Sequence, residues 1–332
     1  MAGVRRISFG GTRALSLRWD GDTLIDDVRG GAGVALDGSK IASHVNWAYS
    51  FDRALRSPSG RFTALYEERG TKAIITTGHS VLRELERSFY HATDYDYPIC
   101  LFALPDGREV IAHCPRAYNR IDIDDLETGE HLTARPAPER SSIFHSHLSA
   151  SPDGRHLLDN GWVWQPWGIL AIIDVREALA RPRSIDDGPL FPRYGINGEP
   201  ESACWLDGDT IVVSTNLEAI WDEEQPTELG PNEIGVRSVS EERWTSTAPL
   251  RKRAGTLVAF GSNVLGLYEH PKLIDPGSGL VLDEWPDIQS GRQEGSFHIQ
   301  GARPRTPAIA VDPDNQRFAV ADGTDVVVVD TR

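Results

Sequence analysis

The stretch SPDGR at residues 151–155 lies between two apolar runs, and similar stretches recur as LPDGR at 104–108 and SPSGR at 57–61. Pro, Asp and Gly are the residues that a tight hairpin turn requires, so each stretch predicts a turn between two strands. The three turns begin 47 residues apart, and four more of similar composition begin at residues 18, 205, 260 and 312. Seven turns at this kind of spacing predict seven copies of one structural unit.

The runs around each turn predict the strands of this unit. ICLFA at 99–103 and EVIAHC at 109–114 flank one turn as the strands of a hairpin would. A third run then ends in Asp, as in ILAIID at 169–174, while helical periodicity is nearly absent apart from VREALA at 175–180. Four strands in roughly 40 to 50 residues are typical of propeller blades. The sequence therefore predicts an all-β fold, a seven-bladed β-propeller of four-stranded antiparallel blades, as a single domain over residues 1–332.

The two ends of the sequence predict how the ring closes. The last unit stops at VVVVDTR with three strands, whereas the chain begins with VRRISFGG ahead of the first turn. We expect residues 4–9 to supply the missing strand of the last blade, because a closed ring removes the exposed sheet edges of a linear array.

SPDGR between two strands, followed elsewhere by runs such as IDDLETGE at 123–130 that close a third strand, resembles the seven-bladed propeller superfamily of bacterial surface-layer-like and WD-repeat proteins. The resemblance covers essentially the whole chain and implies the fold. It transfers no catalytic residue, since propellers host binding proteins and enzymes alike. The chain also departs from WD repeats: Trp19-Asp20 and Trp221-Asp222 do not end a third strand, and Gly78-His79 follows one.

Composition excludes several classes of partner. A net charge of −15 disfavours nucleic acid, because affinity for phosphate backbones comes from clustered Lys and Arg. A neutral or cationic partner fits better. The chain start has no apolar leader region and no window approaches a membrane span, so no membrane partner is expected. Three cysteines without a C-x-x-C motif indicate a reducing compartment, which predicts a cytoplasmic protein, and no cofactor is indicated.

The connections of blades 3 to 5 are the elaborate ones. Connections between second and third strands, and between consecutive blades, share one face of a propeller. Among the connections between second and third strands the longest are residues 114–120, 160–168 and 215–236, and the last of these is acidic. Long loops in compact domains tend to be functional or disordered, so 215–236 is either a lid or partner arm, or a solvated loop.

Three tryptophans, Trp162, Trp164 and Trp167, fall within one of these connections. Two histidines, His145 and His147, lie two apart on the preceding strand and hence on one side of it. Folding the hairpin at 151–155 places His145 opposite Trp162 and His147 opposite Asn160, within one residue.

This arrangement has three interpretations. The histidines and tryptophans are ordinary core between blades, or the tryptophans wall a site for a planar, sugar-like or cationic ligand with a histidine as polar handle. In the third, His-x-His is part of a metal site that needs another donor such as Glu201 or His298.

The main functional hypothesis is binding of a small molecule or a protein segment at the channel mouth. An enzyme of hydrolase, lyase or isomerase type, with His145, His147 and Glu201 as catalytic candidates, is the alternative, and a structural scaffold plugged by 215–236 is a third. The expected ligand-binding residues are Trp162, Trp164, Trp167, His145, His147, Tyr97 and Trp221; other charged candidates at the inner strand ends are Asp52, Arg53, Glu199, Glu201, Arg253 and Arg305.

Overall fold

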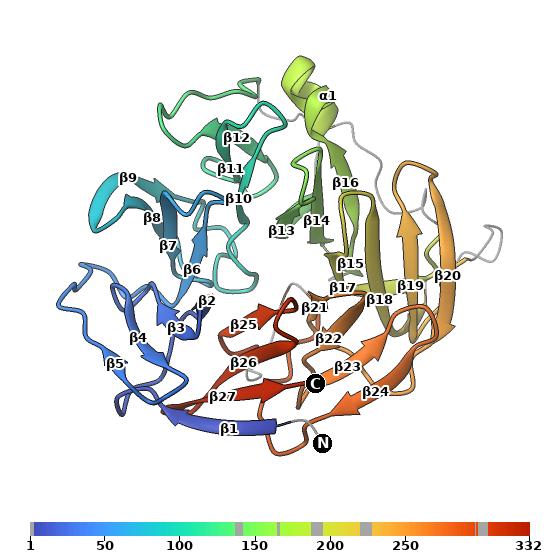
Figure 1. Ribbon diagram of the computed structural model, residues 1–332. Helices are drawn as coiled ribbons and strands as arrows, with labels where there is room; N and C mark the ends of the chain where they lie inside the picture. The colour runs from blue at the N-terminus through green and yellow to red at the C-terminus, as the bar shows by residue number, and fades with distance from the viewer. Residues whose placement is uncertain are drawn as a thin grey trace.

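Each of the seven predicted turns joins the first two strands of one antiparallel sheet. The structure, a computed structural model, describes residues 3–136, 142–164, 167–186, 195–219, 228–295, 297 and 305–332. The seven sheets surround a common axis, which Figure 1 views end-on, and each sheet runs outward from its first strand. The predicted seven-bladed β-propeller is therefore confirmed.

Four blades consist of four consecutive strands each. Blade 1 is β2 (Arg18–Asp20), β3 (Thr23–Asp26), β4 (Ala32–Ala35) and β5 (Lys40–Ile41), and blade 2 is β6 (Arg53–Arg56), β7 (Phe62–Tyr66), β8 (Lys72–Thr77) and β9 (Ser80–Glu86). Blade 5 is β17 (Gly198–Trp205), β18 (Thr210–Ala219), β19 (Glu233–Ser238) and β20 (Arg243–Pro249), and blade 6 is β21 (Leu257–Phe260), β22 (Asn263–Gly266), β23 (Lys272–Asp275) and β24 (Leu280–Glu284).

Blades 3 and 4 differ in their outer part. Among the described residues blade 3 has three strands, β10 (Ile99–Ala103), β11 (Glu109–His113) and β12 (Asp122–Asp125). Blade 4 has β13 (Ile143–Ala150) and β14 (His156–Val163), and two short strands, β15 (Trp167–Gly168) and β16 (Ala171–Asp174), both pair with β14. The predicted helical turn follows as α1 (Val175–Ala180), whose first turn is capped by the Asp174 side chain, and then η1 (Pro182–Ile185).

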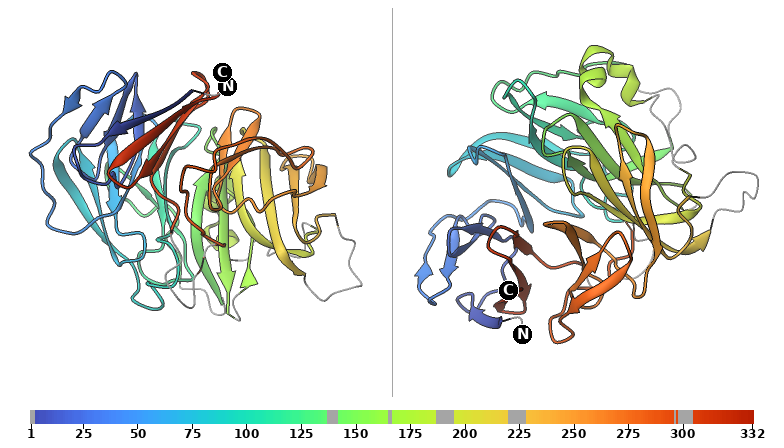
Figure 2. Two further views of the ribbon diagram at one scale, coloured as in Figure 1. Left: turned by 90° about the horizontal axis from the view of Figure 1, so that it is seen from below. Right: turned by 45° about the vertical axis from the view of Figure 1, so that its right-hand side comes forward.

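The ring closes through the first strand of the chain. Blade 7 contains β25 (Ile309–Asp312), β26 (Arg317–Asp322) and β27 (Asp325–Asp330), and β1 (Gly3–Ser8) pairs antiparallel with β27 as the fourth strand. Both ends of the chain lie together in Figures 1 and 2. The expected strand over residues 4–9 is thus shifted by one residue, and Phe9 still donates its backbone N–H to the carbonyl of Thr324 at 3.0 Å.

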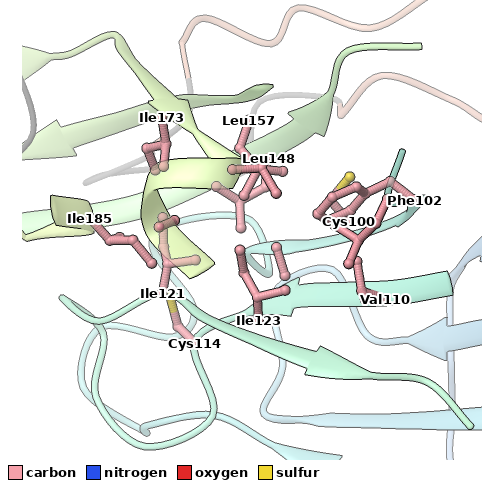
Figure 3. Packing of buried hydrophobic residues seen from close by; sticks show 14 residues of the cluster. Cys100, Phe102, Val110, Cys114, Ile121, Ile123, Leu148, Leu157, Ile173 and Ile185 are labelled. Atoms are coloured by element: carbon pink, nitrogen blue, oxygen red, sulfur yellow. The ribbon is translucent and has the colours of Figure 1, made fainter. Parts of the chain in front are cut away.

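The hydrophobic core lies between neighbouring blades. Figure 3 shows the cluster between blades 3 and 4, where Val110 and Ile123 of one sheet pack with Leu148 and Leu157 of the next. Val175 and Ala178 of α1 join the same cluster. The alternation of apolar residues along each strand supplies both faces of such interfaces.

The turn that begins at Ser151 shows why glycine is needed there. Gly154 has φ +69, and a Cβ at this position would lie 1.8 Å from the carbonyl oxygen of Ala103 in blade 3. Any side chain would therefore clash with the neighbouring blade as well as strain the backbone. Among the described residues no helix is long and apolar enough to cross a membrane.

Candidate functional site

A stack of aromatic rings runs across the face that carries the elaborate connections. Phe297 packs on Trp162 with 5.3 Å between ring centroids, and Trp162 stacks on Phe144 at 4.0 Å. Phe144 stacks on Tyr118 at 4.3 Å, and Tyr118 lies 5.1 Å from Tyr90. We call these five residues the aromatic stack. Its members come from β13, β14 and three separate connections, so the ring positions are set by several blades at once.

A bulge in β13 decides which residue meets Trp162. Phe144 is opposite Trp162 and His147 is opposite Asn160, so two residues of β13 face one of β14 between these pairs. The predicted pairing of His147 with Asn160 is confirmed. The predicted pairing of His145 with Trp162 holds only within its one-residue margin, because the bulge places Phe144 opposite Trp162.

Part of this aromatic assembly faces solvent. Trp162 is fully buried, whereas Trp164, two residues further along, is 54% exposed and Tyr90 is 50% exposed. Phe89 is 86% exposed, and the His91 ring lies 5.0 Å from that of Trp164. We call Phe89, Tyr90, His91 and Trp164 the aromatic surface. It rests on the buried rings beneath it, since Trp164 also contacts Trp162 and Phe144.

Two other aromatic candidates belong to the core. Trp167 packs with Leu158, Ile169 and other residues between blades 4 and 5, and Tyr97 is buried between blades 2 and 3. Burial raises the pKa of the Tyr97 phenol above its usual range. Tyr97 is buried, whereas Trp167 is only partly buried. Trp221 and His298 lie outside the described residues, as do residues 220–227 of the acidic segment 215–236.

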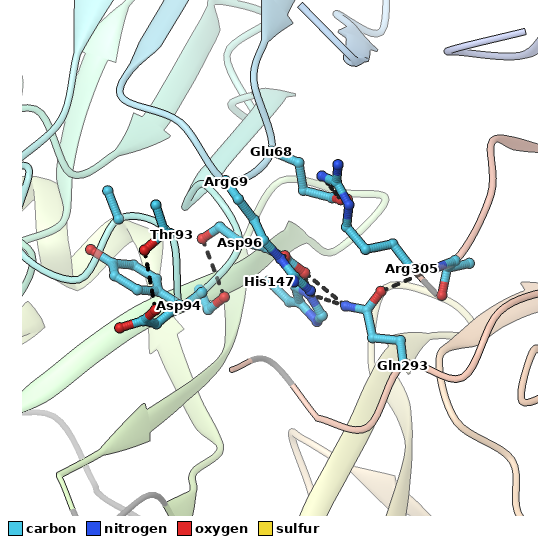
Figure 4. Close-up of polar contacts among 12 residues, drawn as sticks. Glu68, Arg69, Thr93, Asp94, Asp96, His147, Gln293 and Arg305 are labelled. Carbon is cyan, nitrogen blue, oxygen red and sulfur yellow. Dashed lines mark hydrogen bonds and ion pairs between the residues drawn. The ribbon is translucent and has the colours of Figure 1, made fainter. Parts of the chain in front are cut away.

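A polar cluster lies at the inner strand ends, beside the axis (Figure 4). The Asp96 carboxylate is hydrogen-bonded to His147 Nε2 and accepts a bond from Gln293 Nε2 at 2.8 Å. Arg69 Nε lies 3.3 Å from the same carboxylate. Gln293 Oε1 in turn accepts the Thr306 backbone N–H at 3.3 Å. Because His147 belongs to blade 4 and Gln293 to the connection between blades 6 and 7, the cluster ties opposite parts of the ring together.

The remaining charged candidates form ion pairs around the same axis, except Glu199, whose carboxylate accepts hydrogen bonds from the Gly168 N–H and the Asn216 side chain. Arg53 holds the Glu68 carboxylate with two bonds of 2.7 and 2.9 Å, and Arg305 bridges Glu68 and Asp52 at 2.9 and 3.0 Å. Glu201 is bound by Arg253 at 2.8 Å, and that arginine also contacts Glu294. Burial raises the pKa of Glu201 and of Glu68, although the adjacent arginines oppose this.

Each of the three catalytic candidates therefore has a partner of its own. His145 Nδ1 lies 2.6 Å from Asp159 Oδ2 within its own blade, His147 pairs with Asp96, and Glu201 pairs with Arg253. The structure does not bring His147 and Glu201 together as an acid–base pair. Among the described residues no group of three His, Cys, Asp or Glu side chains could hold a metal ion.

The connection from β24 to β25 crosses the axis on this face. Gly291 pairs with Glu269 of blade 6, Gln293 reaches Asp96, and Phe297 forms a bridge with Tyr95 ahead of blade 3. From this connection only His298, as a possible metal donor, and Arg305, as a charged candidate, were expected from the sequence, and the segment considered as a plug of the channel was 215–236. Its length is the one feature of its sequence that could have pointed to a role, because its composition, rich in polar residues and Gly, is that of an ordinary loop.

The connection between β9 and β10 was also missed, although it supplies three of the four residues of the aromatic surface. Its sequence FYHATDYDY at 89–97 holds four aromatic residues in nine positions, of which only Tyr97 was considered. This density is the signal that identifies the segment. The described members of the aromatic surface come from this connection between blades 2 and 3 and, with Trp164, from just after β14 in blade 4.

The polar cluster predicts a dependence of stability on pH. Burial disfavours the charged form of His147, but Asp96 and Glu68 outweigh it and raise the pKa of His147 above the ordinary value for histidine. The folded state then holds this proton more tightly than the unfolded chain, so the stabilisation is complete below about pH 6.5 and is lost as the pH rises through the folded pKa. We expect the urea midpoint to fall between about pH 6.5 and pH 8.5. His147→Gln should reduce the fall of the urea midpoint with pH, whereas His79→Gln, at an exposed turn, should not. If the midpoint fell equally steeply with pH in both variants, His147 would not be the responsible group.

Comparison of the sequence with protein-family models and with curated proteins found no match. Among solved structures the chain is similar to one from the "Crystal Structure of Mitotic Checkpoint Complex", with 12% identity and a TM-score of 0.62, over 98% of this chain and 91% of that one. It is also similar to the Cps50 (Swd1) β-propeller domain of Myceliophteria thermophila, with 14% identity and a TM-score of 0.59, over 99% of this chain and all of that one. At these identities the similarity shows the fold alone.

Proposed function

We propose that the protein is a binding module that takes a protein segment on the aromatic surface. The observation that carries the proposal is Trp164, which is more than half exposed although it rests on a stack of buried rings. Phe89 and Tyr90 extend the exposed apolar area beside it. Trp and Tyr are enriched among the residues that dominate binding energy at protein interfaces.

The supporting rings keep the aromatic surface in one conformation. Trp162 is buried between Phe144 and Phe297, so the ring on which Trp164 leans is held from both sides. A rigid aromatic side chain loses little conformational entropy when a partner covers it. Burial of an exposed large apolar side chain such as Phe89, Tyr90 or Trp164 under a partner contributes up to about 1.5–3 kcal/mol.

The shape of the surface favours a protein segment over a small molecule. Small ligands are bound in concave sites that enclose most of their area. The aromatic surface instead presents three side chains that are half or more exposed, which suits an extended partner. The channel itself is crossed by the segment from Gly291 to Gln293, and the charged groups beside it are paired with one another.

We place this activity in the cytoplasm. Cys100, Cys114 and Cys204 are free thiols, and two of them are buried. Unpaired buried cysteines suit a reducing compartment.

Selection of random peptides against the immobilised protein tests the proposal. We expect recovered peptides to lose at least about tenfold in affinity when Trp164→Ala or Phe89→Ser is introduced, because truncating a central aromatic contact typically costs more than 1 kcal/mol. Isothermal titration calorimetry on the purified variants measures the loss. Val81→Ser, which removes a half-exposed apolar residue from the blade 2 rim, is the matched control. Peptides that bind all three variants equally would overturn the proposed site.

A further inference from the structure

His91 occupies the middle of the aromatic surface. Its ring lies 4.5 Å from that of Tyr90 in an edge-on arrangement, 5.0 Å from Trp164 and 6.0 Å from Phe144. Its Nδ1 atom is 2.7 Å from Asp94 Oδ2. A titratable ring is thus surrounded by three aromatic rings and one carboxylate, within the site for which we propose a binding function.

The backbone is shaped to hold His91 in this position. His91 has φ +54, which is rare for a residue with a side chain and is maintained only where the surroundings fix it. Its carbonyl accepts the Asp94 N–H at 2.8 Å, and the Ser88 hydroxyl accepts the Tyr90 N–H at 3.1 Å. These bonds fold residues 88–94 into a tight loop that presents His91 and Asp94 together.

Aromatic ring faces attract cations, and a carboxylate beside them strengthens this attraction, so the two together are typical of a site that binds a cation. Among the described residues, the titratable groups that contact the His91 ring are the Asp94 carboxylate and the Tyr90 phenol. The other two rings beside it, Phe144 of β13 and Trp164 just after β14, do not titrate. The Asp94 side chain is 30% exposed, and its hydrogen bonds to His91 and Thr93 leave lone pairs for a further donor. Protonated His91 would therefore be a cation that the chain itself places in this site.

We infer that the aromatic surface takes a lysine or arginine side chain of a basic segment, and that the proton on His91 regulates its entry. The inference rests on the proposed function and adds the chemical class of the partner, a basic segment. When His91 is neutral, the incoming cation lies against Trp164 and reaches Asp94. When His91 is protonated, the imidazolium repels that cation and engages Asp94 itself. The net charge of −15 adds a general attraction for basic partners.

The direction of the pH dependence follows from this competition. Binding of the cation favours the neutral ring, so it releases a proton and the affinity rises with pH. At an exposed site two unit charges a few ångströms apart repel by about 1 kcal/mol, which corresponds to roughly fivefold in affinity.

Titration with a fluorescent deca-arginine peptide tests the inference. We expect wild-type affinity to be roughly fivefold higher at about pH 7.5 than at about pH 5.5. His91→Asn should remove this difference, and Asn is suited to the test because it tolerates a positive φ. Asp94→Asn should weaken binding at both pH values. The matched controls are His79→Asn at an exposed turn and Asp314→Asn in the turn between β25 and β26.

Two results would overturn the inference. The first is equal weakening by Asp94→Asn and Asp314→Asn, which would show only non-specific attraction to an acidic protein. The second is a pH dependence that His91→Asn leaves unchanged. Either could occur while selected peptides of neutral composition still depend on Trp164, in which case the proposed function stands and only the cationic partner fails.

Discussion

Deletion of residues 1–10 is expected to lower the melting temperature by roughly 10 °C. The deletion removes β1 and with it Ile7 and Phe9, which are buried between blades 7 and 1. Burial of two such side chains contributes about 3–6 kcal/mol in total, and each kcal/mol corresponds to a few degrees in a domain of this size. The loss also leaves β27 as an exposed edge strand, which favours aggregation. Thermal unfolding followed by circular dichroism and light scattering measures both effects.

Two substitutions within β1 separate ring closure from the simple loss of residues. Ile7→Asn places a polar group in the core between blades 7 and 1, and should reproduce much of the destabilisation. Val4→Asn changes a half-exposed residue of the same strand and should change the melting temperature little. An unchanged melt after the deletion, or equal effects of the two substitutions, would show that β1 does not close the ring.

Trp162→Ala is expected to cost about 3–5 kcal/mol of unfolding free energy. Trp162 is fully buried and stacks between Phe144 and Phe297, so truncation leaves a cavity that rings held by different blades cannot easily fill. Its indole N–H has no hydrogen-bond partner among the described residues, so removing that group exposes no unpaired acceptor there. Urea unfolding measures the loss.

Trp164→Ala is the matched control, since the residue is the same and lies two positions away. It is half exposed, so we expect its removal to change the unfolding free energy by less than about 1 kcal/mol while it removes peptide binding. If Trp164→Ala destabilised the protein as much as Trp162→Ala, both tryptophans would be structural and the proposed function would lose its main support.

The site could be predicted only in part, and the individual residues show why. The repeat turns located Trp162 and Trp164 in the fourth blade and placed His147 opposite Asn160 correctly, but the predicted connection begins later than residue 160, because β14 continues to Val163 and includes Trp162. They could not show the bulge that puts Phe144 rather than His145 against Trp162, because a bulge depends on how two strands settle against their neighbours. Trp167 shows the same limit: it lies three residues beyond Trp164, yet β15 turns it into the core between blades 4 and 5.

The sequence by itself determined the number of blades, the hairpin turns and the use of the N-terminal strand to close the ring. These features are local or repeated: a turn needs its Pro, Asp or Gly at fixed positions, and a strand needs its alternation, whatever lies nearby. Only the tertiary structure decided the site. Phe89, Tyr90, His91, Phe297 and Gln293 come from connections far from blade 4 in sequence, and they meet Trp162, Trp164 and His147 because the closed ring brings those connections to one face. Such contacts depend on the paths of long connections, which no periodic pattern encodes.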